Sequence, residues 1–302
     1  MKILVTGGCG FIGSHIVDEL ISNGHEVMVI DNLSTGLITN LNKSAYFCEV
    51  DFMTSEAERL IIEFQPEIVF HHAAQVSVQK SMFNPIDDAT TNILGTIKLL
   101  EYCSNAGVKK IIYASSAAAY GNPNYLPIDE EHPIRPVSYY GISKHTPEQY
   151  IKTFCSTKEL SFTILRYANV YGKRQDSTGE GGVIAIFLDR LLNKEVPIFF
   201  GDGEQTRDFI YVKDIVNANL FVINNGDNEV FNVSTGSGVS LNNLYDLMNK
   251  GLNTNISPKY ERPRKGDILH SYLDNGKLRE LGWSPQYSIE SGLNDILDNL
   301  DK

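Results

Sequence analysis

The chain has 302 residues, of which 42% are hydrophobic and 21% are charged, and its formal net charge is −11. These values predict a globular protein with a sizeable core in one large domain or two. The acidic balance argues against nucleic acid or an anionic membrane as the main partner, and no apolar run approaches the roughly 18 residues of a membrane span. The N-terminus lacks the apolar region of a signal peptide, so we expect a cytoplasmic protein.

Short apolar runs alternate with stretches of helical periodicity along the first half of the chain. The runs predict strands at residues 3–5, 27–30, 46–50, 68–70, 110–113 and 162–166, and the periodic stretches predict helices at 14–22, 56–64, 93–104 and 140–158. Pro147 falls inside the last of these, which predicts either a kink or a later helix start. The βαβα order predicts a doubly wound parallel (Rossmann) sheet, which binds its ligands at the carboxyl ends of the strands.

The regular alternation ends near Tyr171, where we expect a domain boundary. Residues 1–172, with a return segment near 208–235, should form the larger domain, and residues 173–302 a smaller α/β domain for the substrate. Further helices are expected near 183–193, 214–224, 241–250 and 288–299.

The cysteines and the histidine pair do not indicate a metal site. The four cysteines have no metal-ligand spacing and are typical of buried thiols in a reducing cytosol. His71 and His72 are neighbours on a predicted strand, so their side chains should point to opposite faces. No metal is therefore expected.

A glycine-rich loop follows the first predicted strand and opens the first predicted helix. Gly7, Gly10 and Gly13 fit the spacing of a dinucleotide-binding turn, whose backbone N–H groups meet a pyrophosphate at the helix end. Asp31 ends the second strand, where a carboxylate can accept hydrogen bonds from a ribose diol and would repel a 2′-phosphate. The cofactor should therefore be NAD rather than NADP.

Other strand ends bring small, acidic and hydroxyl side chains to the same sheet edge. Asp51 and Phe52 follow the third strand and suit an adenine edge, and Ala73 and Ala74 follow the fourth and allow the cofactor to approach closely. Two serines, at 115 and 116, follow the strand at 110–113. Taken alone, Asp51, Phe52, Ala73 and Ala74 are unremarkable, and the two serines would more often be turn residues than catalytic ones.

Tyr140 and Lys144 lie four residues apart and would share one helical face. A tyrosine with an ordinary pKa of about 10 is a poor base near neutral pH unless a cation stabilises its phenolate. Lys144 could supply that charge. The spacing is common on solvated helices, so the pair gains weight only from the glycine loop, Asp31 and Ser116.

The chain resembles the extended short-chain dehydrogenases/reductases, and among them the UDP-glucose and UDP-N-acetylglucosamine 4-epimerases. The resemblance spans nearly the whole length. It is carried by T-G-G-C-G-F-I-G at 6–13, D-N-L-S-T-G at 31–36, H-H-A-A-Q at 71–75, S-S-A-A-A-Y-G at 115–121, Y-G-I-S-K at 140–144, L-R-Y-A-N-V-Y-G at 165–172 and T-R-D-F-I-Y-V-K-D at 206–214.

The resemblance implies a role for each matching residue. Tyr140 would be the base, Lys144 would hold the nicotinamide ribose and lower the tyrosine pKa, and Ser116 would bind the sugar 4-hydroxyl. The implied NAD site comprises Tyr140 and Lys144 together with Gly7, Gly10, Phe11, Ile12, Gly13, Asp31, Asn32, Ser34, Gly36, Asp51, Phe52, Ala73, Ala74, Gln75, Asn92, Ser115 and Tyr167. The implied UDP-sugar site comprises Ser116, Ala117, Tyr140, Asn169, Gly182, Val183, Ile198, Phe200, Arg207, Arg264, Asp267 and Ser271.

The same residues narrow the reaction. Related dehydratases place acidic residues after the serine, whereas this chain has alanines at 117–119, so no carboxylic acid is present there to expel a C6 hydroxyl. An epimerase or a nucleotide-4-keto-sugar reductase stays open, and a non-catalytic dinucleotide-sensing regulator is the alternative of another class. Ser271 matches the position that gates the hexose pocket, and its small side chain favours N-acetylated sugars. The resemblance further implies a homodimer formed through the helices at 93–104 and 141–158.

Overall fold

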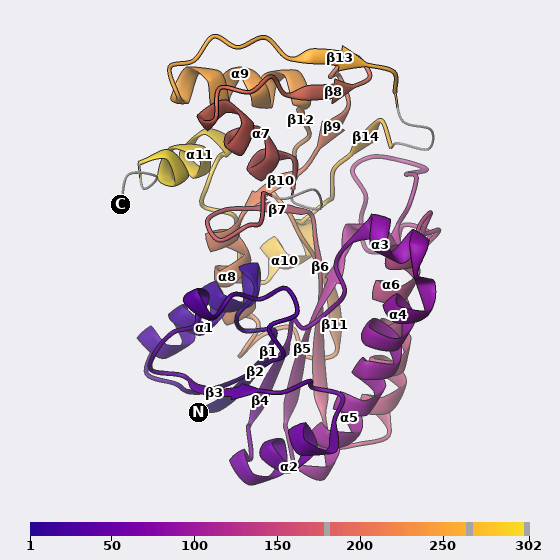
Figure 1. Ribbon diagram of the computed structural model, residues 1–302. Coiled ribbons are helices and arrows are strands. Elements are labelled where there is room, and N and C mark those ends of the chain that lie inside the picture. Colours follow the sequence, from indigo (N-terminus) through magenta and orange to yellow (C-terminus); the bar gives the residue numbers. More distant parts are fainter. Residues whose placement is uncertain (178–181, 264–267, 299–302) are drawn as a thin grey trace.

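The computed structural model describes residues 1–177, 182–263 and 268–298, and it has two lobes (Figure 1). The larger lobe is built on a seven-stranded sheet in the order β11-β6-β5-β4-β1-β2-β3. Every neighbouring pair in this sheet is parallel, so the predicted doubly wound α/β fold is confirmed. The strands are β1 (Lys2–Thr6), β2 (Glu26–Asp31), β3 (Tyr46–Glu49), β4 (Ile68–His71), β5 (Lys110–Ser116), β6 (Ser161–Tyr167) and β11 (Glu229–Val233).

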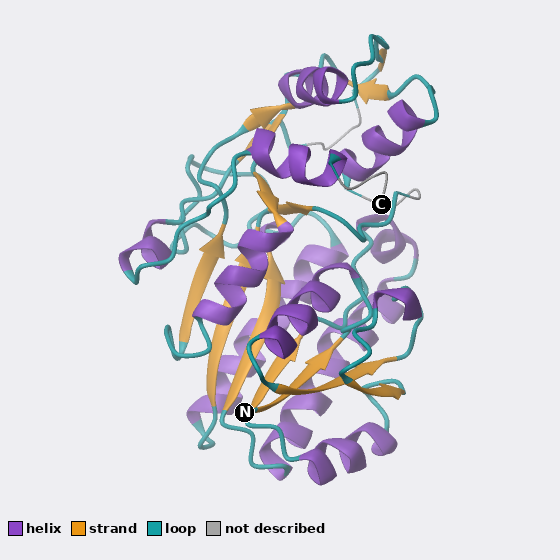
Figure 2. Ribbon diagram, turned by 90° about the vertical axis from the view of Figure 1, so that its left-hand side faces the viewer, coloured by secondary structure: helices purple, strands orange, loops and turns teal. Residues whose placement is uncertain are grey.

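Helices cover both faces of this sheet (Figure 2). Alternate side chains of β1 enter two different cores, as a pleated strand requires. Ile3 and Val5 pack with Ile16 of the first helix, whereas Leu4 packs with Leu99 on the opposite face. One face is covered by α1 (Phe11–Ser22) and α8 (Val212–Phe221), and the other by α2 (Ser55–Phe64), α5 (Gly95–Asn105) and α6 (Tyr139–Ser156).

The helix expected at 93–104 has an N-terminal extension that the sequence reading missed. Asn84 caps α4 by accepting a hydrogen bond from the Asp87 amide, and Pro85 occupies the first turn, where its missing N–H costs nothing. A π-helical turn then links α4 to α5 without a break. The extension comprises α3 (Val78–Phe83), α4 (Pro85–Ala89) and η2 (Thr90–Leu94).

Helix α6 begins before Tyr140 and runs through Pro147. The expected later start is therefore wrong. Ser138 caps the helix by accepting a hydrogen bond from the Gly141 amide, so the start is fixed locally. Pro147 has no N–H to donate, which leaves one helical hydrogen bond unmade inside an otherwise continuous helix.

The second lobe lies above the carboxyl edge of the sheet (Figures 1 and 2). It has its own core, in which the rings of Phe187 and Phe199 stack with centroids 4.9 Å apart. The lobe comprises α7 (Val183–Leu192), β8 (Ile198–Phe200), β9 (Thr206–Arg207), β12 (Val239–Ser240), α9 (Leu241–Gly251), β13 (Lys259–Glu261), β14 (His270–Ser271) and α11 (Ile289–Leu297).

The chain crosses between the lobes more than once. A two-stranded ribbon of β7 (Asn169–Tyr171) and β10 (Phe209–Tyr211) lies at the junction, and α8 and β11 return to the sheet. A later return through α10 (Gly276–Glu280) brings Leu278 and Trp283 into the core of the larger lobe, which the sequence did not indicate. None of the described helices is long and apolar enough to cross a membrane.

Candidate active site

The glycine loop after β1 is shaped by close backbone packing. Gly7 has a φ of +72°, and a Cβ there would lie 2.6 Å from the Ala73 amide nitrogen, while a Cβ on Gly13 would overlap the Gly7 carbonyl oxygen. Gly10 is the N-cap of α1 and provides no side-chain cap. The positive end of α1 therefore faces the loop without a capping side chain, which suits the pyrophosphate of a dinucleotide.

Asp31 is held at the rim of this loop. Its Oδ2 accepts a hydrogen bond from the Cys9 amide at 2.9 Å, and its Oδ1 accepts one from the Leu33 amide at 2.8 Å. Both carboxylate oxygens retain further acceptor capacity, so they can receive the two hydroxyls of a ribose. Gly36 lies against the same carboxylate, where a Cβ would come within 3.0 Å of both oxygens.

The residues after β2 and β3 form a connected rim. The Asn32 amide donates to Asp51 at 3.1 Å, and its own oxygen accepts from the Ser34 amide nitrogen at 3.1 Å. Phe52 is buried, with its ring 5.3 Å from that of His71. The Phe52 side chain is therefore part of the core of the larger lobe.

The end of β4 is tied to the helices beside it. The Gln75 amide donates to Asn92 Oδ1 at 2.8 Å, and Asn92 Nδ2 in turn donates to Ser143 Oγ at 2.9 Å. The two histidines lie on opposite faces, as predicted. His71 contacts Thr96, and His72 contacts the Tyr167 hydroxyl, which the sequence had assigned to the cofactor.

Tyr140 and Ser116 meet at the carboxyl edge of the sheet. Burial raises the pKa of Tyr140, and its hydrogen bond with Ser116 acts in the opposite direction. Lys144 lies over the Tyr113 ring at 4.7 Å, and burial lowers its pKa to about 8. Burial is the largest influence on the Tyr140 phenol, and the role of Lys144 as the cation that lowers its pKa stays a prediction.

A buried ion pair between Glu148 and Arg166 lies next to Lys144 along the helix, and the sequence reading missed it. Glu148 continues the helical row of Tyr140 and Lys144, and Arg166 donates to it from β6 in a fork, at 3.0 and 2.6 Å. Ser115 Oγ donates to the same carboxylate at 2.6 Å. The Ser115 hydroxyl therefore anchors α6 to β5.

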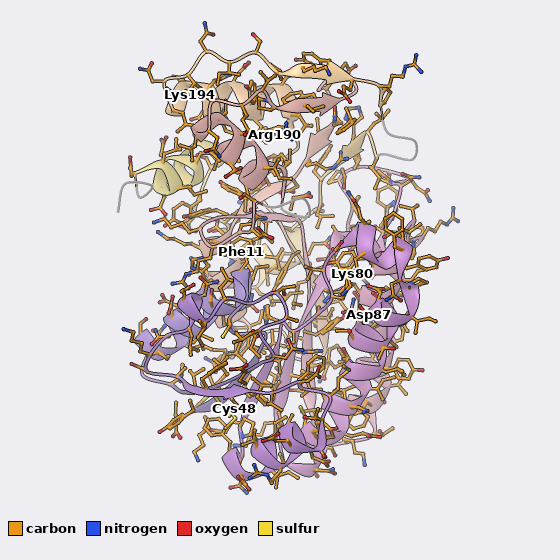
Figure 3. All side chains as sticks on the ribbon, in the orientation of Figure 1. Phe11, Cys48, Lys80, Asp87, Arg190 and Lys194 are labelled. Carbon is orange, nitrogen blue, oxygen red and sulfur yellow. The ribbon has the colours of Figure 1, made fainter. Side chains whose placement is uncertain are left out.

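The residues assigned to the substrate come from several elements of the second lobe and the junction. Register pairs Arg207 in β9 with Ser271 in β14, and Asn169 in β7 donates to the Asp208 carbonyl at 3.1 Å. Phe11 packs against the core of this lobe and lies at the junction in Figure 3. Gly182 and Val183 begin α7, Ile198 and Phe200 bound β8, and Arg264 and Asp267 lie outside the described residues.

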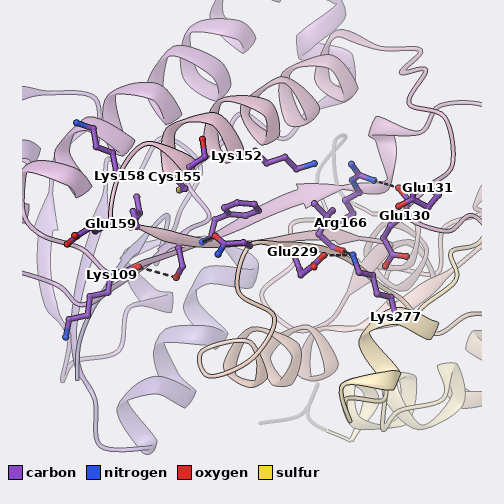
Figure 4. A pocket seen from close by; sticks show the side chains of 16 residues that line it. Lys109, Glu130, Glu131, Lys152, Cys155, Lys158, Glu159, Arg166, Glu229 and Lys277 are labelled. Carbon is purple, nitrogen blue, oxygen red and sulfur yellow. Dashed lines mark hydrogen bonds and ion pairs between the residues drawn. The ribbon is translucent and has the colours of Figure 1, made fainter.

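A large groove of about 860 Å³ lies away from this edge, beside β6, β11 and the end of α6 (Figure 4). Its lining mixes cations and anions, and among them Lys277 pairs with Glu229 at 2.7 Å. None of the site residues predicted from the sequence lines it. The groove is therefore separate from the candidate site.

A nucleotide cradle and a Tyr–Lys pair that meet at one sheet edge are the features that define an extended short-chain dehydrogenase/reductase. The family model described as the NAD dependent epimerase/dehydratase family matches residues 3–234. The chain belongs to this family, and its cofactor is NAD.

Solved and curated proteins resemble the chain over their whole lengths. The UDP-glucose 4-epimerase of Mycolicibacterium smegmatis is 40% identical, over 97% of this chain and 96% of that protein. The crystal structure of UDP-glucose 4-epimerase from Thermotoga maritima, with UDP-glucose, has a TM-score of 0.97 and 48% identity, over 100% of this chain and 99% of that one. The UDP-N-acetylglucosamine 4-epimerase of Methanobrevibacter ruminantium, in complex with UDP-N-acetylmuramic acid, has a TM-score of 0.94 and 38% identity, over 98% and 97%.

Proposed function

We propose that this chain is a UDP-hexose 4-epimerase that inverts C4 through a 4-keto sugar and accepts N-acetylated as well as plain hexoses. The observation that carries the proposal is the hydrogen bond between Tyr140 and Ser116, followed by a turn of three alanines where a dehydratase would need an acid. The relatives named above support it, since they are 4-epimerases of UDP-glucose and of UDP-N-acetylglucosamine.

The two lobes would divide the ligands between them. The larger domain, 1–172 with the return at 208–235, would hold NAD. The close-packed glycine loop fits its pyrophosphate, and the acceptor oxygens of Asp31 fit its ribose. The smaller domain, 173–302, would hold the uridine diphosphate, with Arg207 on the phosphates. The sugar would then lie between the lobes, beside Ser116 and Tyr140.

The proposed chemistry uses few protein groups. When bound, NAD supplies a reversible hydride acceptor for the sugar C4. Tyr140 would take the proton of the 4-hydroxyl and return it to the ketone oxygen, and Ser116 would orient that oxygen. Lys144, as an ammonium, would stabilise the phenolate formed on Tyr140.

Turnover without added cofactor tests the proposal. The purified protein, incubated with UDP-N-acetylglucosamine alone, should form the C4 epimer, because the reaction involves no net oxidation. A 4-keto-sugar reductase would need stoichiometric NAD(P)H, and a non-catalytic regulator would form no product. Tyr140→Phe should lose about 10²- to 10⁴-fold in kcat while retaining NAD, and normal turnover in that variant would rule out the mechanism.

Ser271 is the proposed determinant of sugar size. It lies beside Arg207 on the neighbouring strand, and a small side chain there leaves room for a 2-acetamido group. Ser271→Tyr should lower kcat/KM for the acetylated sugar at least tenfold relative to the plain sugar. Ser271→Ala, the matched control, should keep the ratio of the two within about twofold.

We further propose a homodimer. Phe83 and Ile86 are 88% and 78% exposed in the layer of α3 and α4, and Leu94, Ile142 and Tyr150 are exposed nearby on η2 and α6. Apolar side chains gathered in this way favour an interface. Phe83→Asp should give a monomer by light scattering, whereas Leu37→Asp, an exposed leucine on a loop outside this layer, should leave the dimer intact.

The location proposed for the protein is the cytoplasm. All four cysteines are free, which suits a reducing compartment. Cell fractionation with an antibody to the chain would test this, and recovery from an oxidising compartment would contradict it.

A further inference from the structure

Asp88 of α4 is a buried carboxylate, and none of the cations in the described part of the chain lies at hydrogen-bonding distance from it. Its side chain is 1% exposed. Oδ1 accepts hydrogen bonds from Gln75 Nε2 at 2.7 Å and from Asn92 Nδ2 at 3.3 Å, but the buried Oδ2 has no partner among the described residues. A buried carboxylate with half of its acceptor capacity unused destabilises a fold, so its presence calls for an explanation.

The charge of Asp88 acts on Tyr140 and Lys144, the proposed catalytic pair, and on one further tyrosine beside them. Helices α4 and η2 pack on the first turns of α6, and the Asp88 charge acts on Lys144, on Tyr140 and on the buried Tyr113 of β5. It favours the ammonium form of Lys144, whose pKa burial lowers to about 8.

The other titratable groups around Lys144 differ from Asp88 in how they act on its ammonium form. Glu148 also favours the ammonium and has the larger effect, yet its carboxylate is forked by Arg166 and bonded to Ser115. On the β4 side, burial first and then Lys144 lower the pKa values of His71 and His72, so these rings stay neutral near pH 7. Among the described residues, Asp88 is thus the carboxylate near Lys144 that forms no ion pair with another cation.

Hydrogen bonds also connect Asp88 to the helix that carries Lys144. Asn92 donates both to Asp88 and to Ser143, the residue before Lys144. Gln75 donates to Asp88 and belongs to the loop after β4. The charge therefore has a fixed place relative to the ammonium, which a mobile surface carboxylate would lack.

We propose that Asp88 is the counter-ion of Lys144, a positioning residue that holds the lysine as an ammonium in the resting site. The role rests on the proposed function, in which the ammonium stabilises the phenolate of Tyr140. In this role Asp88 would act through Lys144 and would not itself contact the sugar.

Asp88→Asn tests the role with little change of shape. The amide oxygen can take the place of Oδ1 and keep both donors, and the amide nitrogen can replace the unpartnered Oδ2. Asp87→Asn is the matched control, since the side chain of the adjacent Asp87 is partly exposed and pairs with Lys80 at 2.8 Å (both are labelled in Figure 3).

The primary readout is the acylation rate of Lys144 against pH, followed by mass spectrometry with acetic anhydride, because only the neutral amine reacts. In Asp88→Asn the midpoint should fall by at least one pH unit, which is a tenfold change in the ionisation constant. The pH at which kcat declines on the alkaline side should shift downward by a similar amount. The melting temperature should change little, because the amide keeps the shape of the side chain and both hydrogen bonds to its oxygen. Asp87→Asn should match the parent in all three, and light scattering verifies that both variants keep its oligomeric state.

An unchanged acylation midpoint in folded Asp88→Asn would overturn the proposal. A variant that lost thermal stability without a shift in the midpoint would assign Asp88 a purely structural role, which would overturn it as well. The acylation readout needs no turnover of a UDP-sugar. A failed epimerase assay would therefore refute the proposed function separately from the role of Asp88.

Discussion

Replacing Glu148 by glutamine should destabilise the fold by an amount that the structure defines. The Glu148 side chain is fully buried and that of Arg166 is 4% exposed. Burial raises the pKa of Glu148, but its bonds with His145, Arg166 and Ser115 outweigh this and lower the pKa from 4.5 to about 2. A difference of this size corresponds to about 3 kcal/mol of unfolding free energy, which matches the ~3–5 kcal/mol typical when one partner of a buried pair is removed.

The pH dependence gives the prediction a sign. Because the pKa of Glu148 is lower in the folded chain, its contribution is fully present well above pH 4.5 and is lost as the pH falls toward 2. In urea unfolding followed by circular dichroism, Glu148→Gln should be about 3 kcal/mol less stable than the parent at pH 7, and this gap should narrow by about 1 kcal/mol at pH 4.

The double variant Glu148→Gln/Arg166→Met provides the control. It removes the cation that the single variant leaves unpaired, so it should be more stable than Glu148→Gln alone. If the unfolding free energy of Glu148→Gln lay within about 0.5 kcal/mol of the parent at pH 7, the reasoning would be refuted, because ordinary surface substitutions have effects of that size. A difference in unfolding free energy that did not change with pH would refute it as well.

Two further substitutions test the backbone geometry. Gly13→Ala should abolish NAD retention, because the added Cβ would overlap the Gly7 carbonyl oxygen. Gly24→Ala, the control, has open space around it and should lower only the stability of the fold. The absorbance of bound cofactor after gel filtration checks both variants. Lys194, exposed after α7, has a left-handed φ of 57° in a turn that returns hydrogen bonds to Leu191 and Arg190. Lys194→Gly should therefore raise the unfolding free energy by about 1 kcal/mol, and a lower melting temperature would contradict this.

The parts of the fold that depend on local patterns could be predicted from the sequence. The first two strands, the glycine loop and Asp31 follow one another along the chain, so apolar runs and glycine spacing were sufficient to place them. The helix ahead of α5 was missed because Asn84 and Pro85, which start it, lie beyond the apolar periodicity that was used. A closer reading of Asn-Pro as a helix start could have found it.

The electrostatic partners of Lys144 could not be predicted in the same way. Glu148 lies one turn beyond Lys144 and would ordinarily be assigned to a solvated helix face, and Asp88 lies in a stretch with two adjacent acidic residues. What separates Asp88 from Asp87 is burial, which depends on how α4 packs against α6. The two aspartates have the same chemistry and adjacent positions, yet Asp87 pairs with Lys80 at the surface, whereas the charge of Asp88 acts on Tyr140 and Lys144. Burial lowers the pKa of Lys144 and the charges of Glu148 and Asp88 oppose that effect. All three depend on tertiary packing, which a motif that contains only Tyr140 and Lys144 omits.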